Sequence, residues 1–295
     1  ALLTNTTGQY NNAFGNDALK VNTASNNTAV GHAALVANTT GAANTSVGYS
    51  SLYQNTTGAA NGAFGYQTLF SNTTGADNVA VGTNALYNNL TASNNTAVGR
   101  ESLFANTTAA NNTAVGYQSL TANTTGASNT VVGKQAAKAN TTGANNVAIG
   151  DSAAFAATTS TGNVIIGQAA VQTGVFTGFN NVVIGKLAGE DLTSADANVI
   201  IGEDAGKNQT TADSNVLIGQ GAGEDNTTGA ENVAVGQNSL ANNTTAGSNT
   251  AVGRGSMFTN TTGANNTGIG FDALYANTTG TNNVAIGINA GASNT

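Results

Sequence analysis

Apolar and polar positions alternate in a short segment that recurs along the whole chain with a period of 17 residues. Each copy begins with Asn, continues with three residues that are mostly small or β-branched, and ends with Gly, as in residues 27–31 and 198–202. We number the Asn position 1 and the Gly position 5. A fixed short period predicts a solenoid, in which each repeat is one coil that buries its apolar side chains only against neighbouring coils. The Gly residues fall at 15, 31, 48, 65, 82, 99, 116, 133, 150, 167, 185, 202, 219, 236, 253, 270 and 287.

The recurring segment predicts a strand rather than a helix. Two repeats would match the length of a helical repeat, so a helix in each unit is arithmetically allowed. However, Asn, Gly and β-branched residues are unfavourable in helix interiors, and the segment alternates with period two between Asn- and Gly-rich flanks. We therefore predict an all-β fold, a parallel β-solenoid or β-roll with one coil per 17 residues and about 17 coils. A second short strand is expected at positions 6 to 9, and Asn-Thr-Thr-Gly at positions 12 to 15 is expected to form the return turn.

The coil model assigns a role to each recurring position. Asn at position 1 is expected to form a ladder of side-chain hydrogen bonds, and Gly at position 5 a corner with positive φ or a close backbone approach. Position 4 is always Val, Ile or Phe, and we expect it to face the interior, with replacement of Val115 by Asp unzipping the stack locally. The predicted buried column includes Val98, Val115, Val132 and Ile149.

Position 3 would then face outward, and it is Ala in most coils. In four consecutive coils it is a larger aliphatic residue, which would give an exposed apolar stripe. The alternative is a broader core with these side chains turned inward. We favour a subunit interface, whose candidate residues are Ile165, Val183, Ile200 and Leu217.

Composition limits the classes of partner. The chain has 295 residues, 7% charged, with seven basic residues and a net charge of −7. Nucleic acid and anionic membranes are disfavoured, because both need clustered Lys and Arg. No apolar run is long enough for a membrane span. Uniform repetition favours one solenoid over residues 1–295, and ends that fall in mid-repeat lead us to expect a segment of a longer fibre protein.

The residues that carry catalytic and metal chemistry are scarce. There is no Cys and a single His, His32, at a variable position where we expect it to be exposed. We therefore predict a protein that is not an enzyme, with no catalytic, cofactor-binding or metal-binding residues. Acidic residues concentrate between 190 and 231, where the repeat places Glu203 beside Lys186, so a solvated patch with Lys pairing is favoured over a Ca²⁺ site.

Asn-x-Ser/Thr sequons are abundant, which makes N-glycosylation a candidate modification. The alternative is a turn that favours Asn and Thr for its own hydrogen bonds. Full occupancy is not expected, because a glycan is wider than the coil spacing of about 4.8 Å. The candidate sites include Asn5, Asn38, Asn55, Asn72, Asn106, Asn123, Asn140, Asn226, Asn260 and Asn277.

The Asn-x-Ala-Ile/Val-Gly-x-x-Ala signature, as at residues 146–150 and 232–236, resembles the head repeats of trimeric autotransporter adhesins and similar repeats in phage tail-fibre-like proteins. The resemblance covers every coil. It implies a left-handed parallel β-roll, three chains packed side by side, and attachment to host surfaces. The adhesin repeat is shorter, so the extra residues lie in the Asn-Thr-Thr-Gly turn, and the neck, stalk and membrane anchor of those adhesins are not present in this sequence.

These observations predict a structural and adhesive fibre segment that is extracellular, on a cell or virion surface. The expected partner is the same chain, in a trimer or an end-to-end fibre, and a cell-surface or glycan receptor is a candidate partner. The alternatives are a phage tail-fibre shaft and a solenoid that presents its Thr columns, such as Thr39 and Thr40, to glycan or ice.

Overall fold

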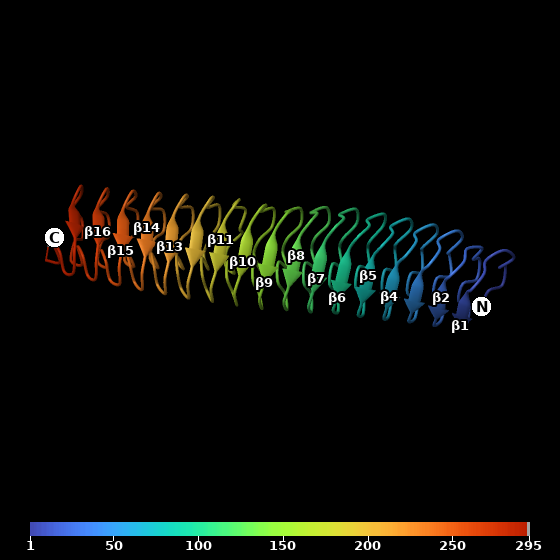
Figure 1. Ribbon diagram of the computed structural model, residues 1–295. Coiled ribbons are helices and arrows are strands. Elements are labelled where there is room, and N and C mark those ends of the chain that lie inside the picture. The colour runs from blue at the N-terminus through green and yellow to red at the C-terminus, as the bar shows by residue number, and fades with distance from the viewer. Residues whose placement is uncertain (294–295) are drawn as a thin grey trace. The chain divides into compact units, whose positions relative to one another are not determined.

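The computed structural model describes residues 1–293 and divides into two compact units, Ala1–Asn145 and Asn146–Thr295. Each unit is a parallel β-solenoid in which one short strand recurs in every coil, and no helix occurs within the described residues (Figure 1). The all-β solenoid with 17-residue coils is therefore confirmed. The strands of the first unit are β1 (Asn12–Phe14), β2 (Thr28–Val30), β3 (Thr45–Val47), β4 (Gly62–Phe64), β5 (Val79–Val81), β6 (Thr96–Val98), β7 (Thr113–Val115) and β8 (Thr130–Val132).

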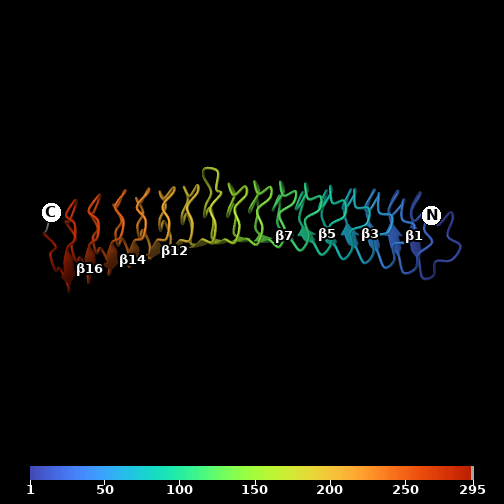
Figure 2. The same ribbon diagram turned by 90° about the horizontal axis from the view of Figure 1, so that it is seen from above.

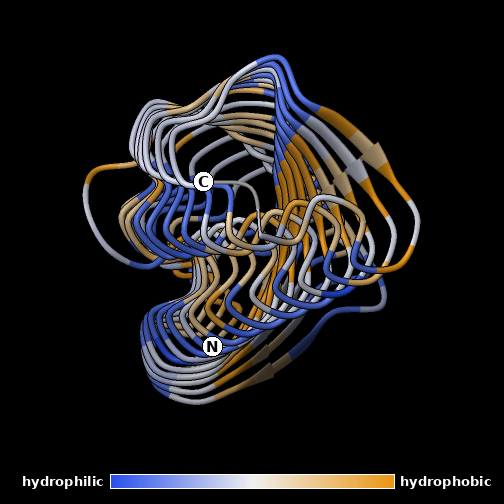
Figure 3. Cartoon of the chain, turned by 90° about the vertical axis from the view of Figure 1, so that its left-hand side faces the viewer, coloured by the Kyte–Doolittle hydropathy of each residue, from blue (hydrophilic) through white to orange (hydrophobic). Residues whose placement is uncertain are grey.

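The second unit continues the pattern with strands of the same length. Within each unit a strand pairs in parallel with the next strand in sequence, so identical coil positions lie over one another, as for Ala97 and Ala114. Side chains at one position thus form a column along the stack, and in Figure 3 the backbone of successive coils is coloured in bands of similar hydropathy. The strands of the second unit are β9 (Val147–Ile149), β10 (Val164–Ile166), β11 (Val182–Ile184), β12 (Val199–Ile201), β13 (Val216–Ile218), β14 (Val233–Val235), β15 (Thr250–Val252), β16 (Thr267–Ile269) and β17 (Val284–Ile286).

Two buried columns of Asn hold neighbouring coils together. At position 1, the backbone N–H of Asn61 donates to Asn44 Oδ1 (3.0 Å), while Asn61 Nδ2 donates to the carbonyl of Gly75 (2.9 Å). The position 1 ladder was predicted. A second ladder runs through position 12, where Asn55 Nδ2 donates both to Asn38 Oδ1 (2.8 Å) and to its own turn at Gly58 O (2.9 Å). These bonds satisfy amides that would be costly to bury without partners.

The predicted facing of the strand is wrong by one position. Position 3 is buried in the interior, whereas the position 4 side chains face outward: Val132 and Ile149 are each 37% exposed, and Val98 and Val115 are partly exposed. Because side chains alternate along a strand, a shift of one residue exchanges the two faces. The interior is narrow, and the Leu at position 9 already fills most of it, so the opposing strand position must be small. Ala at position 3 meets that need.

The four larger residues at position 3 are core, which overturns their assignment to a subunit interface. Ile165 is 1% exposed, and Val183, Ile200 and Leu217 are 0% exposed. In three of these coils position 9 is Gly instead of Leu. A Cβ on Gly223 would lie 2.8 Å from Leu217 Cδ2, and one on Gly206 would lie 2.9 Å from Leu217 Cδ1. The larger side chain at position 3 therefore fills the space that is left when Gly replaces Leu at position 9, as close packing requires.

The second predicted strand, at positions 6 to 9, is absent from the described coils. This segment is a turn in which positions 7 and 9 adopt left-handed backbone, for example φ 58° at Glu101 and 50° at Leu103. Left-handed backbone costs about 1 kcal/mol for a residue with a Cβ. Burial of Leu103, which is 0% exposed, offsets that cost.

Gly at position 5 is required for two reasons, as predicted. Gly116 has φ +134°, and a Cβ there would lie 2.4 Å from the carbonyl oxygen of Gly133 in the next coil. No other residue fits this corner without moving the neighbouring backbone.

The coil that contains β10 has one extra residue and departs from the pattern. Gly174 and Val175 form an added loop, with Val175 63% exposed, and a loop in this part of the second unit projects beyond its neighbours (Figure 2). Phe176 then occupies position 12, so the Asn ladder is replaced by an apolar column of Ala157, Phe176 and Leu192. None of the described segments is a helix long and apolar enough to cross a bilayer.

Candidate ligand-binding cavities between two side-chain columns

The sequons at position 12 are part of the buried ladder, which contradicts their assignment as glycosylation sites. Asn72 is 0% exposed, and its Nδ2, the atom that would carry a glycan, donates to Asn55 Oδ1 (2.8 Å) and Gly75 O (3.0 Å). The turn-forming alternative accounts for these residues. Asn5, in the incomplete first coil, is only partly buried, so its glycosylation stays a prediction. The other nine candidates, all 0–2% exposed, are Asn38, Asn55, Asn72, Asn106, Asn123, Asn140, Asn226, Asn260 and Asn277.

The acidic patch of the second unit forms ion pairs between coils. Lys186 Nζ lies 3.2 Å from Glu203 Oε1, as predicted, and Lys207 Nζ lies 3.9 Å from Glu190 Oε2 of the preceding coil. Partial burial raises the pKa of Glu224, and the neighbouring carboxylates of Asp225 and Asp204 raise it further. No group of three or more potential metal-binding side chains is found within residues 1–293.

Aromatic side chains form stacked columns at positions 6 and 10 of the first unit. At position 6, His32 stacks on Tyr49 (5.0 Å between ring centroids) and Tyr49 on Tyr66 (5.4 Å). His32 is exposed, as predicted, but its place in a ring column was not foreseen. At position 10 the planes of successive rings are nearly parallel. The position 10 pairs are Tyr53 with Phe70 (4.9 Å), Phe70 with Tyr87 (5.0 Å) and Tyr87 with Phe104 (5.3 Å).

A cavity of about 420 Å³ lies between these two columns, at the point where position 10 changes from aliphatic to aromatic. Tyr53 stacks on Phe70 on one side only, because the residue before it in the column is the short Val36. The outer part of one Tyr53 ring face is therefore left uncovered. The remaining lining residues are Asp17, Lys20, His32, Ala33, Tyr49, Ser50 and Gln67.

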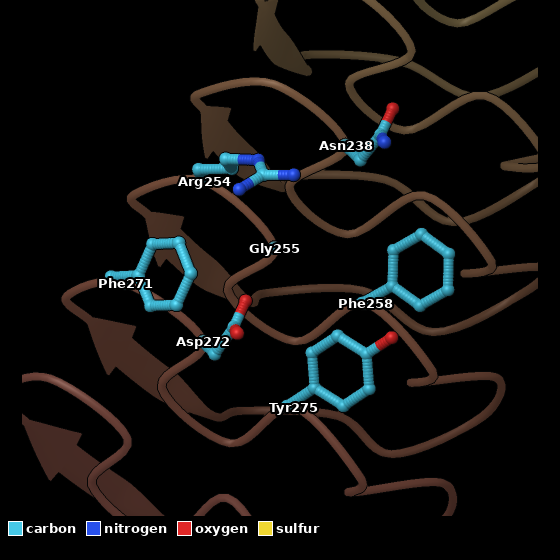
Figure 4. A pocket seen from close by; sticks show the side chains of 7 residues that line it. All are labelled: Asn238, Arg254, Gly255, Phe258, Phe271, Asp272 and Tyr275. Carbon is cyan, nitrogen blue, oxygen red and sulfur yellow. The ribbon is translucent and has the colours of Figure 1, made fainter.

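The second unit has a cavity of about 280 Å³ at the same coil positions (Figure 4). Position 10 again changes from a small residue, Ala241, to the aromatic pair Phe258 and Tyr275, whose centroids lie 5.3 Å apart. Across the cavity, the Arg254 guanidinium lies 5.6 Å from the centroid of the Phe271 ring. One wall therefore carries a cation held on a ring, and the other carries a ring pair.

Polar groups lie between the two walls of this cavity. Asp272 leans over Gly255, where a Cβ would lie 2.2 Å from Asp272 Oδ1, so the glycine makes room for the carboxylate. Within residues 1–293 the Asp272 carboxylate makes no hydrogen bond and no ion pair in the structure. Asn238 lines the same space (Figure 4).

Sequence reasoning missed both cavities, although the signal for them is present. Tyr and Phe recur at positions 6 and 10 with the 17-residue period, and stacking follows directly once coils are in register. The cavities themselves depend on small residues that precede the aromatic ones in a column. The position 13 Thr columns, by contrast, use their hydroxyls within the stack: Thr56 Oγ1 donates to Thr73 O (3.1 Å).

The arrangement of each cavity is suited to binding. A partly uncovered ring face, hydrogen-bonding side chains and a concave shape are the usual components of small-ligand sites. Comparison of the sequence with known protein families finds no family model that matches the chain, and comparison with curated proteins finds no match.

Proposed function

We propose that this chain is a structural and adhesive segment of an extracellular fibre on a cell or virion surface. The observation that carries the proposal is that the position 1 Asn ladder and the strand pairing repeat coil after coil in each unit, so that the position of a residue in its coil determines its contacts along the stack. A solenoid of this kind is an efficient spacer because every coil adds length at nearly constant stability. The resemblance to adhesin head repeats supports the same conclusion.

The fibre assembles, in this proposal, through the outer face of the strands. Positions 2 and 4 carry Thr, Val, Ile, Phe, Asn or Gly and no charged residue in any coil. Val79 is 43% exposed and Phe64 is 41% exposed. Strands with apolar residues on both faces are normally covered on both. A second copy of the chain is the partner whose side chains repeat with the same spacing, so that two faces can interdigitate.

The size of this face favours contacts that extend beyond the strand. Three residues at about 3.3 Å and coils at about 4.8 Å give a face on the order of 400 Å² for the eight strands of the first unit. Stable interfaces bury about 800 Å² on each partner. Side chains next to the strand must therefore contribute, as in a trimer in which each chain contacts two others; end-to-end stacking is the alternative.

Negative-stain electron microscopy combined with native mass spectrometry tests the proposal. We expect elongated particles and a mass that is a small multiple of the 28.9 kDa chain. Compact globular monomers at micromolar concentration would refute the fibre assignment.

Binding of a surface ligand is the second part of the proposal. It is favoured by the two cavities at matching coil positions, which a purely passive spacer does not need.

A further inference from the structure

We propose that the cavity of the second unit binds one pyranose ring of a neutral saccharide. The inference deepens the adhesive part of the proposed function and does not depend on fibre assembly. It rests on the residues that line the cavity in Figure 4: Asn238, Arg254, Phe258, Phe271, Asp272 and Tyr275.

The apolar requirement of a sugar is met by the ring of Phe258. Stacked rings normally offer a ligand only their edges, because their faces are occupied by one another. Phe258 is the first ring of its pair: Tyr275 stacks on one face, whereas the preceding residue of the column, Ala241, has no ring to stack on the other. A pyranose has a face of C–H groups that packs on such an uncovered ring.

The polar requirement is met by groups of both types. Arg254 supplies N–H donors in a planar fork, Asp272 supplies acceptors, and Asn238 supplies both. The cation–π contact with Phe271 holds the Arg254 guanidinium at the cavity while leaving its edge free. Hydroxyl groups on neighbouring sugar carbons donate and accept, so they can pair with a carboxylate and a guanidinium at once.

Charge and size select the ligand class. One cation and one anion in the lining cancel, which favours a neutral ligand over a carboxylated sugar or a quaternary ammonium ion. The cavity of about 280 Å³ is just below the range of about 300–1,000 Å³ typical of drug-sized ligands, which suits one sugar ring better than an oligosaccharide.

The first unit provides matched controls for each contact. Arg100 lies 5.9 Å from the centroid of the Tyr117 ring, an arrangement like that of Arg254 on Phe271. Phe104 is the last ring of its position 10 column and, like Phe258, stacks on one ring only, in its case Tyr87 at 5.3 Å. Neither residue lines the cavity of the second unit.

Saturation-transfer NMR on the full chain, with a panel of methyl pyranosides, tests the inference. We expect saturation transfer to the C–H protons of at least one neutral pyranoside, with a Kd on the order of 1 mM, as suits a single small ring. F258L and R254K should each raise that Kd about tenfold, because each removes one planar contact that the replacement cannot restore. F104L and R100K should leave the Kd unchanged, and circular dichroism should show that all four variants are folded.

The inference is overturned if no neutral pyranoside receives saturation, if F258L and R254K bind as the parent does, or if sialic acid or choline binds more tightly than any neutral sugar. If microscopy shows elongated particles but no sugar binds, the sugar-binding inference is wrong and the fibre proposal stands. If a compact monomer binds sugar, the fibre proposal is wrong and the sugar-binding inference stands.

Discussion

The hydrogen bonds that a buried Asn makes in this protein are determined by its position in the coil. An Asn at position 12 donates simultaneously to the coil before it and to its own turn, and it is fully buried. An Asn at position 1, just before the strand, likewise donates twice: its backbone N–H donates to the Asn of the coil before it, and its side-chain amide donates to a carbonyl of the next turn. Because such groups have no access to water, their replacement leaves neighbouring amides without partners.

Asn72→Asp is expected to lower the free energy of unfolding at pH 7 by about 3 kcal/mol or more, since a carboxylate would replace both donors and face two buried acceptors. The loss should shrink at acidic pH, where the protonated side chain can donate once. Urea denaturation at pH 7 and pH 4 measures both effects. Thr74→Asp, in the same turn but exposed, is the control and should have little effect.

Glu224→Gln is expected to stabilise the protein slightly at neutral pH. Partial burial, with Asp225 and Asp204 nearby, raises the pKa of Glu224 above its ordinary value. A raised carboxylate pKa means that the ionised form is less favourable in the folded than in the unfolded state. The penalty is therefore present above the folded pKa and relieved as pH falls through it. Thermal melting should show a higher Tm for the variant at pH 7 and no difference well below the ordinary pKa of Glu; an equal shift at both would contradict this account.

At the scale of the element, the coil is governed by a volume exchange between positions 3 and 9. Leu217 with Gly223 and Ala234 with Leu240 are alternative ways to fill the same space, and the two coils are directly adjacent, with Leu217 paired to Ala234. The interior therefore accepts either arrangement beside the other.

Leu240→Gly alone is expected to cost about 2–5 kcal/mol, because the cavity it leaves outweighs the relief of left-handed backbone at φ 53°. Adding Ala234→Leu should recover most of that loss, since the double variant reproduces the neighbouring coil. Urea denaturation of the two single variants and the double variant gives the coupling energy. Additive effects would show that the two positions do not share one space.

The sequence predicts the coil better than it predicts its cross-section. Period, strand, the position 1 ladder and the Gly corner follow from residue types that have few alternatives. Which face of the strand is buried does not follow from residue types, because a strand of three residues, with Ala at position 3 and Val at position 4, has too few positions to show a burial pattern. Position 9 holds the missing information: Gly189, Gly206 and Gly223 accompany the large residues at position 3, and this correlation indicates which face is inside. The cavities could not be predicted because they depend on the size of the side chain that precedes an aromatic residue in its column, 17 positions earlier in the sequence.

At the scale of the molecule, the proposed assembly depends on which strand face is free. Ile200 and Ile201 are neighbours in β12 that point in opposite directions, the first fully buried and the second partly exposed. They provide a test of the facing and of the proposed interface together.

Ile201→Lys is expected to weaken self-association while leaving the melting temperature of the dilute protein close to that of the parent, because its charge stays in water when the chain is alone. Ile200→Lys should instead disrupt the surrounding coils, since an unpaired cation would enter a dry interior. Sedimentation velocity and circular dichroism distinguish the two outcomes. If Ile201→Lys associates as the parent does, the outer strand face is not the interface.

The irregular coils show where this design tolerates change. The coil between Gly15 and Gly31 is one residue short and lacks a residue after Thr23, whereas the coil that contains β10 has its one extra residue near Gly174. Both differences fall in the turn that precedes the next strand. Elsewhere in a coil, a single inserted residue would move the following side chains of that coil out of their columns. Loss or duplication of a whole repeat, by contrast, leaves all columns continuous. A gain or loss of whole repeats in the gene is therefore expected to change the length of the protein without requiring any compensating substitution, so we expect length to vary among related genes more freely than sequence at the buried positions.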